Sequence, residues 1–311
     1  MIRFSIRRLR HTAAMAASGA ALAAAVAVAV PAAAATSHTP AGRQAGYGAG
    51  RELPVVAGTD YLALGDSVSF GYREPATAPP PDYAVPGSFA GFPEDVAAAL
   101  GLHVANASCP GETSASLIND TAPSNGCENS PGGQPGYRSL YPLHVSYSGS
   151  QLSFAVSYLE HHPRTRLVTL MIGANDAFLC EETTADRCAS ELPRVLRQVS
   201  GNVAAILRAI RYRAHYRGQI ALVYYYSLDY ANATDDAQSQ ALNQAMADGA
   251  AGYHTEIANG YAAMAGAARY SGNDTCTAGL LTQLTTGGCG IHPSVAGQDV
   301  LAQAVEAAVY K

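Results

Sequence analysis

The stretch YLALGDSVSFGY, residues 61–72, joins a short apolar run to an abrupt polar break. The run ends at Gly65 and has the length and composition of a buried strand. Asp66 and Ser67 follow at once. Ligands of open α/β sheets bind at the carboxyl ends of the strands. The stretch therefore predicts a strand whose end presents a carboxylate and a hydroxyl to a functional site.

Three further apolar runs predict strands, and amphipathic segments separate them. The run LVTLMI is almost continuously apolar, as in a parallel strand with both faces buried. Alternation of strands and helices predicts βαβ units, hence a parallel sheet with helices on both faces. Gly, Pro, Ser and Asn predict a long loop in residues 110–149. The predicted strands are residues 102–107, 167–172 and 220–226, and the predicted helices are residues 89–100, 150–162, 192–210, a segment after residue 236 and the segment after Pro293.

The first 35 residues have the pattern of a secretory signal peptide. Four arginines precede a stretch of Ala, Val and Leu, and small residues at 33–35 form an A-x-A cleavage site. A membrane anchor is the alternative, which the alanine-rich composition disfavours. Arg7 and Arg8 would suit twin-arginine export, but the flanking pattern fits it poorly. We expect a signal peptide at 1–35, a flexible lead-in at 36–56, a single domain at 57–311, and a secreted, extracellular protein.

The formal charge of the chain is acidic. Removing a leader with four arginines and no acids changes the net charge from −5 to −9. A surface of this sign repels the phosphates of nucleic acids. We therefore expect no nucleic-acid partner.

The six cysteines predict disulfides, because an even number occurs in a chain with an export signal. Six cysteines allow 15 pairings. A zinc site is the alternative, but the sequence has no C-x-x-C and no H-x-x-x-H, so we expect no metal. Spacing favours pairs of neighbours, namely Cys109 with Cys127, Cys180 with Cys188, and Cys276 with Cys289.

Polar clusters follow three of the predicted strands, and a fourth precedes the last predicted helix. Each alone is an ordinary turn or helix cap. Their order, and the position of three of them at strand ends, indicates one site. The clusters are Gly65-Asp66-Ser67, then Asn106-Ala107-Ser108 with Cys109-Pro110-Gly111, then Gly173-Ala174-Asn175-Asp176, and last Gly290-Ile291-His292-Pro293.

In these clusters the chain resembles the GDSL or SGNH hydrolases, and within them secreted bacterial esterases and lipases. The resemblance extends from about residue 60 to the C-terminus. It implies a three-layer α/β/α sandwich with a parallel, flavodoxin-like sheet and no cofactor. By the same resemblance Ser67 is the nucleophile and His292 the base. The implied oxyanion hole consists of the backbone N–H groups of Ser67 and Gly111 and the side-chain amide of Asn175.

These residue types suit ester hydrolysis, which passes through a tetrahedral oxyanion. Fixed N–H donors stabilise that charge. Asn175 carries such a donor, whereas an ionised Asp176 does not. Gly111 has no side chain to keep its N–H from a substrate. His292 can take the Ser67 proton and return it to the leaving alcohol.

The chain departs from the family at the acid of the triad. The family usually has Asp three residues before the histidine, a position that Cys289 occupies here, and residues 285–292 contain no carboxylate. A histidine base still needs a partner for Nδ1–H. Some secreted members of the family use a backbone carbonyl at this position. We expect the Cys289 carbonyl to orient His292, with Asp274 or Asp299 as alternatives.

The sequence thus predicts a secreted carboxylic ester hydrolase, an esterase or lipase that forms an acyl-enzyme. We expect a monomer that acts on a small-molecule or lipid ester and does not insert stably into membranes after signal cleavage. One alternative is a carbohydrate deacetylase or esterase of the same fold. Another is a secreted binding protein without activity, which only the missing Asp supports. Tyr137, Tyr141 and Tyr147 could form an acyl-binding wall or simply pack the long loop.

Overall fold

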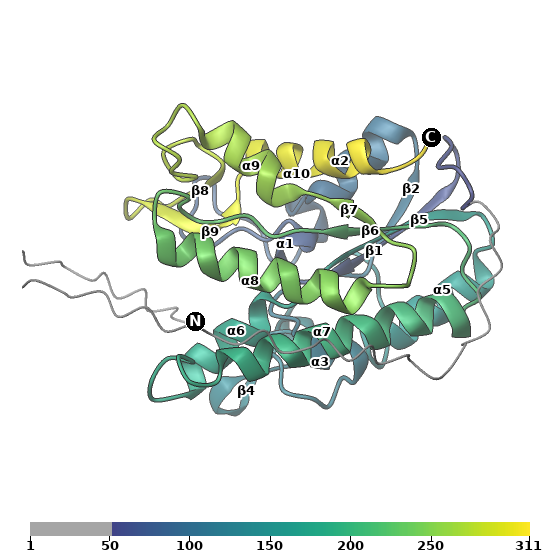
Figure 1. Cartoon of the computed structure of the whole chain (residues 1–311), viewed down its shortest axis with the longest axis horizontal. Helices are drawn as coiled ribbons and strands as arrows, with labels where there is room; N and C mark the ends of the chain where they lie inside the picture. Colours follow the sequence, from purple (N-terminus) through teal and green to yellow (C-terminus); the bar gives the residue numbers. More distant parts are fainter. Residues whose placement is uncertain (1–51) are drawn as a thin grey trace, which may run out of the picture. The chain divides into compact units, whose positions relative to one another are not determined.

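Five parallel strands form the central sheet of the computed structural model, which describes residues 52–311 (Figure 1). The expected signal peptide and most of the expected lead-in lie outside the described residues. Adjacent strands follow the order β2-β1-β5-β6-β7. Numbered among themselves, the five strands have the flavodoxin-like order 2-1-3-4-5. They are β1 (Asp60–Gly65), β2 (His103–Asn106), β5 (Thr165–Met171), β6 (Gln219–Val223) and β7 (Glu256–Ala258).

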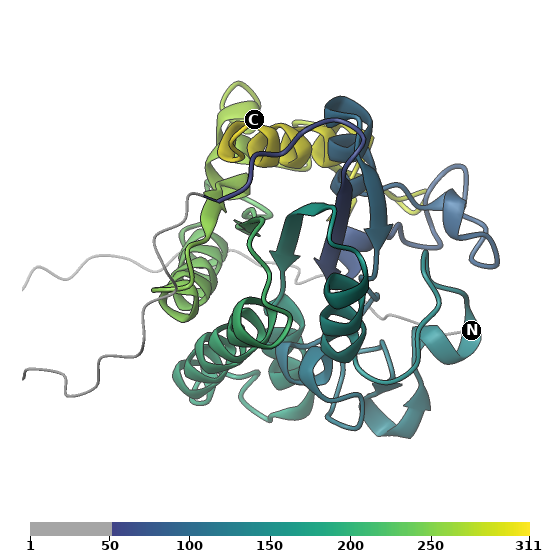
Figure 2. The same ribbon diagram turned by 90° about the vertical axis from the view of Figure 1, so that its right-hand side faces the viewer.

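Helices cover both faces of this sheet, which confirms the predicted three-layer α/β/α class (Figures 1 and 2). On one face α10 packs against α2 and α9, and on the other α7 packs against α8 and α3. The first layer contains α2 (Phe92–Leu100), α9 (Gly260–Ala268) and α10 (Val295–Ala308). The second contains α3 (Ser114–Ile118), α5 (Gln151–His161), α6 (Ala174–Thr183), α7 (Leu192–Arg208) and α8 (Ala233–Ala250).

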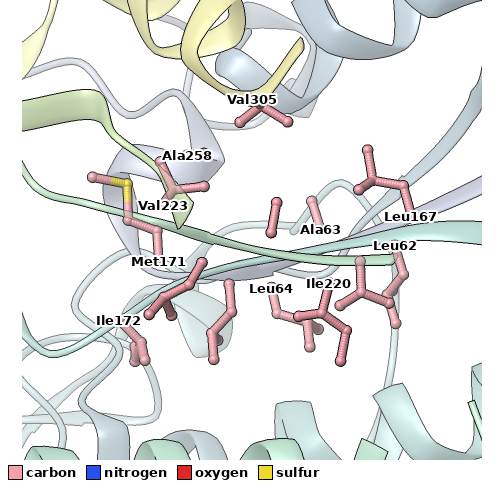
Figure 3. Close-up of a cluster of buried hydrophobic side chains, with 14 of the residues drawn as sticks. Leu62, Ala63, Leu64, Leu167, Met171, Ile172, Ile220, Val223, Ala258 and Val305 are labelled. Atoms are coloured by element: carbon pink, nitrogen blue, oxygen red, sulfur yellow. The ribbon is translucent and has the colours of Figure 1, made fainter. Parts of the chain in front are cut away.

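The core lies between the sheet and these two helix layers. Leu62 and Leu64 of β1 and Ile220 of β6 are fully buried. Figure 3 shows them with Val305 of α10, which lies across the sheet from them. Burying one such side chain stabilises the fold by about 1.5–3 kcal/mol. Strands apolar on both faces are required here because helices remove both faces from water.

The segment between β2 and α5 is not the plain loop that its composition predicts. Besides α3 it contains β3 (Asn129–Ser130), β4 (Gln134–Pro135) and α4 (Tyr137–Leu140). These elements have two to five residues. Elements so short produce no periodic pattern in the sequence. Side-chain caps and turns determine where they form instead. For α3, the Thr113 hydroxyl accepts from the Ser116 N–H at the helix start.

An antiparallel hairpin precedes the last helix. It consists of β8 (Leu281–Gln283) and β9 (Cys289–Pro293). His292 therefore lies on a strand, and its cluster precedes the last helix as the sequence predicts. The helix α10 begins after Ser294, whose side chain accepts from the Gly297 N–H.

All six cysteines form disulfides, in the neighbouring pairs that the spacing favours. The Cα–Cα separations are 5.6 Å for Cys109–Cys127, 5.2 Å for Cys180–Cys188 and 5.8 Å for Cys276–Cys289. These separations are in the usual range for disulfides.

No helix among residues 52–311 is long and apolar enough to cross a bilayer.

Candidate active site

Ser67 stands at the carboxyl end of β1, as its place in the sequence predicts. It is the first residue of the short helix α1 (Ser67–Phe70), and the Asp66 carboxylate caps this helix by accepting from the Val68 N–H at 3.0 Å. Gly65 has φ +148°, and a Cβ there would lie 2.3 Å from the Met171 carbonyl oxygen. Only glycine allows the chain to turn so sharply beside β5.

The hairpin brings His292 to this serine. His292 Nε2 lies 2.9 Å from Ser67 Oγ, a hydrogen-bond distance between residues 225 positions apart. The imidazole is mostly buried, and its ring centroid lies 4.8 Å from that of Tyr72. Tyr226 donates to the Ile291 carbonyl at 2.6 Å and so holds β9 just before the histidine. The structure therefore brings together the predicted nucleophile and base.

The partner of Nδ1 is Glu74, which the sequence analysis did not consider. Glu74 Oε1 lies 2.8 Å from His292 Nδ1. The expectation that the Cys289 carbonyl orients this histidine was wrong, and neither Asp274 nor Asp299 takes its place. The physical reason is that a carboxylate from the loop after α1 occupies the Nδ1 side of the ring.

Glu74 fits because the hairpin makes room for it and supplies donors. Its Oε1 accepts from the backbone N–H groups of Ile291 and His292, at 2.9 and 3.3 Å. Its Oε2 accepts from the Thr282 hydroxyl at 2.5 Å. A Cβ on Gly290 would lie 2.0 Å from Oε1, so a side chain there would displace the carboxylate. A glycine two residues before the histidine thus has a local reason.

The environment of Glu74 favours its ionised form. Burial alone would raise its pKa, but the hydrogen bond and charge of His292 and the bond from Thr282 lower the pKa to about 2. The carboxylate is therefore charged at neutral pH. It can hold the Nδ1–H tautomer of His292 and stabilise an imidazolium.

Asn175 lies in the first turn of α6 and contacts Asp66, the residue before Ser67, and both ends of its side-chain amide are hydrogen-bonded. Nδ2 donates to Asp66 Oδ2 at 3.3 Å, and Oδ1 accepts from Asn125 Nδ2 at 3.2 Å. Asp66 Oδ2 also accepts from the Tyr225 hydroxyl. Burial raises the pKa of Asp66 to about 6, against the effect of these hydrogen bonds. Asp66 thus accepts from the Asn175 amide and holds it in place.

Gly111 occupies the turn after β2 with φ +83°. A Cβ there would meet the Asn125 carbonyl oxygen at 2.6 Å. The Asn125 N–H donates to the Gly111 carbonyl at 2.8 Å, while its side chain contacts Asn175 as above. Asn125 thus links the two expected oxyanion donors. The sequence analysis missed it because an asparagine in a Gly- and Ser-rich segment has no distinguishing pattern.

Asp176, the neighbour of Asn175, has a structural place. Its carboxylate accepts from the Ser114 N–H at 2.7 Å and the Ser114 hydroxyl at 2.6 Å. These bonds tie α6 to α3. The Asp176 carboxylate is therefore occupied by its bonds from Ser114. An ionised carboxylate has no hydrogen to donate to an oxyanion, so we expect no role for it in the oxyanion hole.

A surface of aromatic rings begins at His292 and runs outward; we call it the aromatic surface. From Tyr72 it continues to Tyr83, whose centroid lies 5.8 Å away, and then to Tyr141 at 5.2 Å. Tyr137 lies against Tyr141 at 5.3 Å. Of the three loop tyrosines, Tyr147 is absent from this surface because its hydroxyl donates to the Ala107 carbonyl and its ring packs elsewhere. The aromatic surface consists of the partly exposed rings of Tyr72, Tyr83 and Tyr141, which lie on the buried rings of Phe70, Phe89 and Tyr137.

Three potential metal ligands lie together near Gly111. Cys109, Glu112 and Cys127 have ligand atoms within 4.8 Å of one another. The two sulfurs form a disulfide and cannot act as thiolate ligands. This group is therefore not a metal site.

A sequence profile of the GDSL-like Lipase/Acylhydrolase family matches residues 63–300. No curated protein matches the chain.

Similar solved structures show the same fold at low identity. A phospholipase A1 from Streptomyces albidoflavus is 18% identical with a TM-score of 0.50, over 81% of this chain and 100% of that one. An acetylxylan esterase from Geobacillus stearothermophilus is 15% identical with a TM-score of 0.47, over 81% and 94%. An alpha/beta hydrolase from the metagenome of Lake Arreo, Spain, is 17% identical with a TM-score of 0.47, over 81% and 95%.

Proposed function

The chain belongs to the GDSL-like lipase/acylhydrolase family, and we propose that it is a serine carboxylic ester hydrolase with Ser67 as nucleophile. One observation carries the proposal. Ser67 Oγ, His292 and Glu74 form a continuous hydrogen-bonded chain with distances of 2.9 and 2.8 Å. A nucleophile, a base and a group that orients the base are the parts that acyl transfer requires.

In the first half of the reaction, His292 Nε2 takes the Ser67 proton as Oγ attacks the ester carbonyl carbon. The resulting oxyanion accepts from the N–H groups of Ser67 and Gly111 and from the free N–H of Asn175. Glu74 stabilises the imidazolium that forms. Collapse of the intermediate breaks the ester C–O bond, and His292 donates its proton to the leaving alcohol.

In the second half, water replaces the alcohol. His292 takes a proton from the water as its oxygen attacks the acyl carbon. The same donors hold the second oxyanion. When this intermediate collapses, the bond to Oγ breaks, Ser67 regains a proton from His292, and the carboxylic acid leaves.

The aromatic surface favours an ester with an apolar chain. It starts next to His292, and its ring of Tyr141 is 37% exposed. Val85 and Leu140, which are close in sequence to Tyr83 and Tyr141, are 48% and 46% exposed. Removing apolar surface from water stabilises a bound chain by about 0.8 kcal/mol for each buried CH₂. This favours a lipase or medium-chain esterase over a carbohydrate deacetylase. Three disulfides also favour an extracellular location.

A panel of nitrophenyl esters from acetate to dodecanoate tests the proposal. We expect kcat/KM to rise with chain length, and Ser67→Ala to abolish hydrolysis while Ser157→Ala, an exposed serine on α5, does not. Tyr141→Ala should lower kcat/KM for long esters about tenfold and leave acetate unchanged. Tyr270→Ala is the control, because Tyr270 is 85% exposed and lies outside the aromatic surface. Cleavage of acetylated sugars alone would contradict the acyl-chain assignment.

A further inference from the structure

One buried amide connects the two chain segments that carry the backbone donors of the proposed oxyanion hole. Gln151, the first residue of α5, is fully buried. Its Oε1 accepts from the Gly65 N–H at 2.7 Å, and its Nε2 donates to the Gly65 carbonyl at 3.0 Å. The second hydrogen of Nε2 points to Glu112 Oε2, at 3.0 Å. Gly65 lies two residues before Ser67, and Glu112 directly follows Gly111.

The Glu112 side chain is fully buried and has neutral hydrogen-bonding neighbours. One oxygen accepts from Gln151, and the other is bonded to the Ser116 hydroxyl in α3. Within residues 52–311 no basic side chain forms an ion pair with it, because Arg138 pairs with Glu128 instead. No step of the proposed ester hydrolysis involves the Glu112 carboxyl group.

We propose that Gln151 and Glu112 are positioning residues, which fix the Gly111 N–H relative to the Ser67 N–H so that both donors meet one oxyanion. This inference rests on the proposed function, since the donors matter only for acyl transfer. Gln151 holds the end of β1 through both backbone groups of Gly65. Glu112 extends that hold to the turn that contains Gly111.

The backbone alone does not supply this connection. The last backbone bond between the two segments runs from the Cys109 N–H to the Gly65 carbonyl, at 3.2 Å. Gly111 lies two residues further on, in a turn with φ +83°. Backbone bonds hold this turn to its own surroundings, from the Asn125 N–H to the Gly111 carbonyl and from the Glu112 N–H to the Cys109 carbonyl, but neither bond reaches the segment of Ser67. A displacement of about 1 Å in a catalytic group can cost about 10² in rate.

A neutral Glu112 suits this arrangement. Burial raises its pKa, and the charge of Glu128 raises it further. A protonated carboxyl can donate to Ser116 Oγ while its other oxygen accepts from Gln151. A glutamine at position 112 would reproduce both bonds with its own N–H and carbonyl.

The first test compares two buried glutamines. Gln151→Met keeps the shape of the side chain and removes its three hydrogen bonds. Gln219→Met is the matched control, because Gln219 is also buried and bonds the Leu53 carbonyl and both backbone groups of Tyr310, at the far end of the sheet. We expect similar losses of Tm. On nitrophenyl acetate we expect a fall in kcat of about 10–10² with little change in KM for Gln151→Met only.

A tetrahedral inhibitor separates positioning from folding. Phenylboronic acid forms an adduct on a serine nucleophile that places an oxygen in the oxyanion hole. Its Ki should rise with the fall in kcat for Gln151→Met and stay constant for Gln219→Met. An equal kcat and Ki in the two variants would overturn the inference.

Variants at Glu112 provide a second arm should Gln151→Met fold poorly. Glu112→Ala should lower kcat, and Glu112→Gln should restore most of that loss, since it reproduces both hydrogen bonds. A Glu112→Gln variant with a kcat as low as that of Glu112→Ala would show that the hydrogen bonds of a neutral side chain at position 112 do not determine kcat.

Hydrogen exchange distinguishes a failure of this inference from a failure of the proposed function. The Gly65 N–H should exchange faster in Gln151→Met than in Gln219→Met, as should amides in residues 109–116, whether or not the protein cleaves esters. Equal exchange in the two variants would show that Gln151 does not hold these segments, and it would leave the proposed function untouched. If the wild-type protein cleaves no ester while the two variants still differ in exchange, the proposed function is wrong but the structural role of Gln151 is confirmed.

Discussion

At the scale of single residues, the side chain that most defines the site is Glu74. Its carboxylate accepts four hydrogen bonds, from Thr282, from the Ile291 N–H, and from both the backbone and the ring of His292. Bonds of this kind lock the rotamer of a carboxylate and the orientation of its partner. The histidine is therefore held on both sides, by Glu74 at Nδ1 and by Ser67 at Nε2.

We expect Glu74→Gln to lower kcat by about 10³–10⁴, since the loss of a triad acid in a serine protease costs about 10⁴. The amide keeps the size of the side chain but removes the charge that stabilises the imidazolium. Steady-state kinetics on nitrophenyl acetate measure the effect. Glu160→Gln, on the exposed side of α5, serves as the control. Full kcat in Glu74→Gln would show that His292 needs no acid.

Ser67, Gly111, Asn175 and His292 could be proposed from the sequence because each lies in a short motif that resembles those of the family. Glu74 could not, because it reaches the histidine across 218 positions of sequence and no local pattern marks it. The partners expected for the histidine, Cys289, Asp274 and Asp299, all lie near it in the sequence. A Glu seven residues after the nucleophile is evident only once the hairpin is seen to fold over α1.

At the scale of elements, the hairpin of β8 and β9 positions the histidine and its acid together. Tyr226 of the segment after β6 fixes the Ile291 carbonyl, and the Cys276–Cys289 disulfide joins the hairpin to the preceding loop. Gly290 completes the fit, because its missing side chain leaves the space that Glu74 fills. The hairpin, the segment after β6 and the loop after α1 are distant in sequence, and together they fix the His292 ring.

Gly290→Ala should therefore lower kcat about as much as Glu74→Gln, because the new Cβ would overlap Glu74 Oε1. The control is Gly87→Ala, since a Cβ at Gly87 meets nothing within 4 Å. Both variants should be compared by kcat and by thermal unfolding. If Gly290→Ala keeps wild-type kcat, the carboxylate is not required in the observed place.

The long helices and central strands were predictable from apolar runs and periodicity, because burial on the sheet demands such patterns. The edge strand β7 and the hairpin were not. A strand of three residues such as β7 gives no pattern, and in β9 only Gly290, His292 and Pro293 are buried. Tertiary contacts, rather than local propensity, determine both.

At the scale of the whole molecule, buried acids make stability depend on pH in an unusual direction. Burial raises the pKa of Asp66 and of Asp176 to about 6, from an ordinary value of 3.8. The folded state then binds more protons than the unfolded state between about pH 4 and 6. The free energy of unfolding therefore falls as pH rises through that window. Glu74 has the opposite sign, but its contribution is lost only below its ordinary value of 4.5.

We expect the free energy of unfolding in urea to be larger at pH 5 than at pH 7. A pKa that moves from 3.8 to 6 corresponds to up to about 3 kcal/mol for each group over the whole titration, of which about 1 kcal/mol falls between pH 5 and pH 7. Asp176→Asn, which changes no member of the hydrogen-bonded chain from Ser67 to Glu74, should remove part of the difference. An unfolding free energy that increases from pH 5 to pH 7 in the wild-type protein would refute this account of the buried acids.

The central claim is that Ser67 forms a covalent intermediate with help from His292. The most direct measurement is to react the protein with a fluorophosphonate and locate the adduct by peptide mass spectrometry. We predict one adduct, on Ser67, with loss of ester hydrolysis in proportion to labelling, and a much slower reaction in His292→Ala. Labelling at another residue, or an unlabelled Ser67 in a protein that loses activity, would contradict the account.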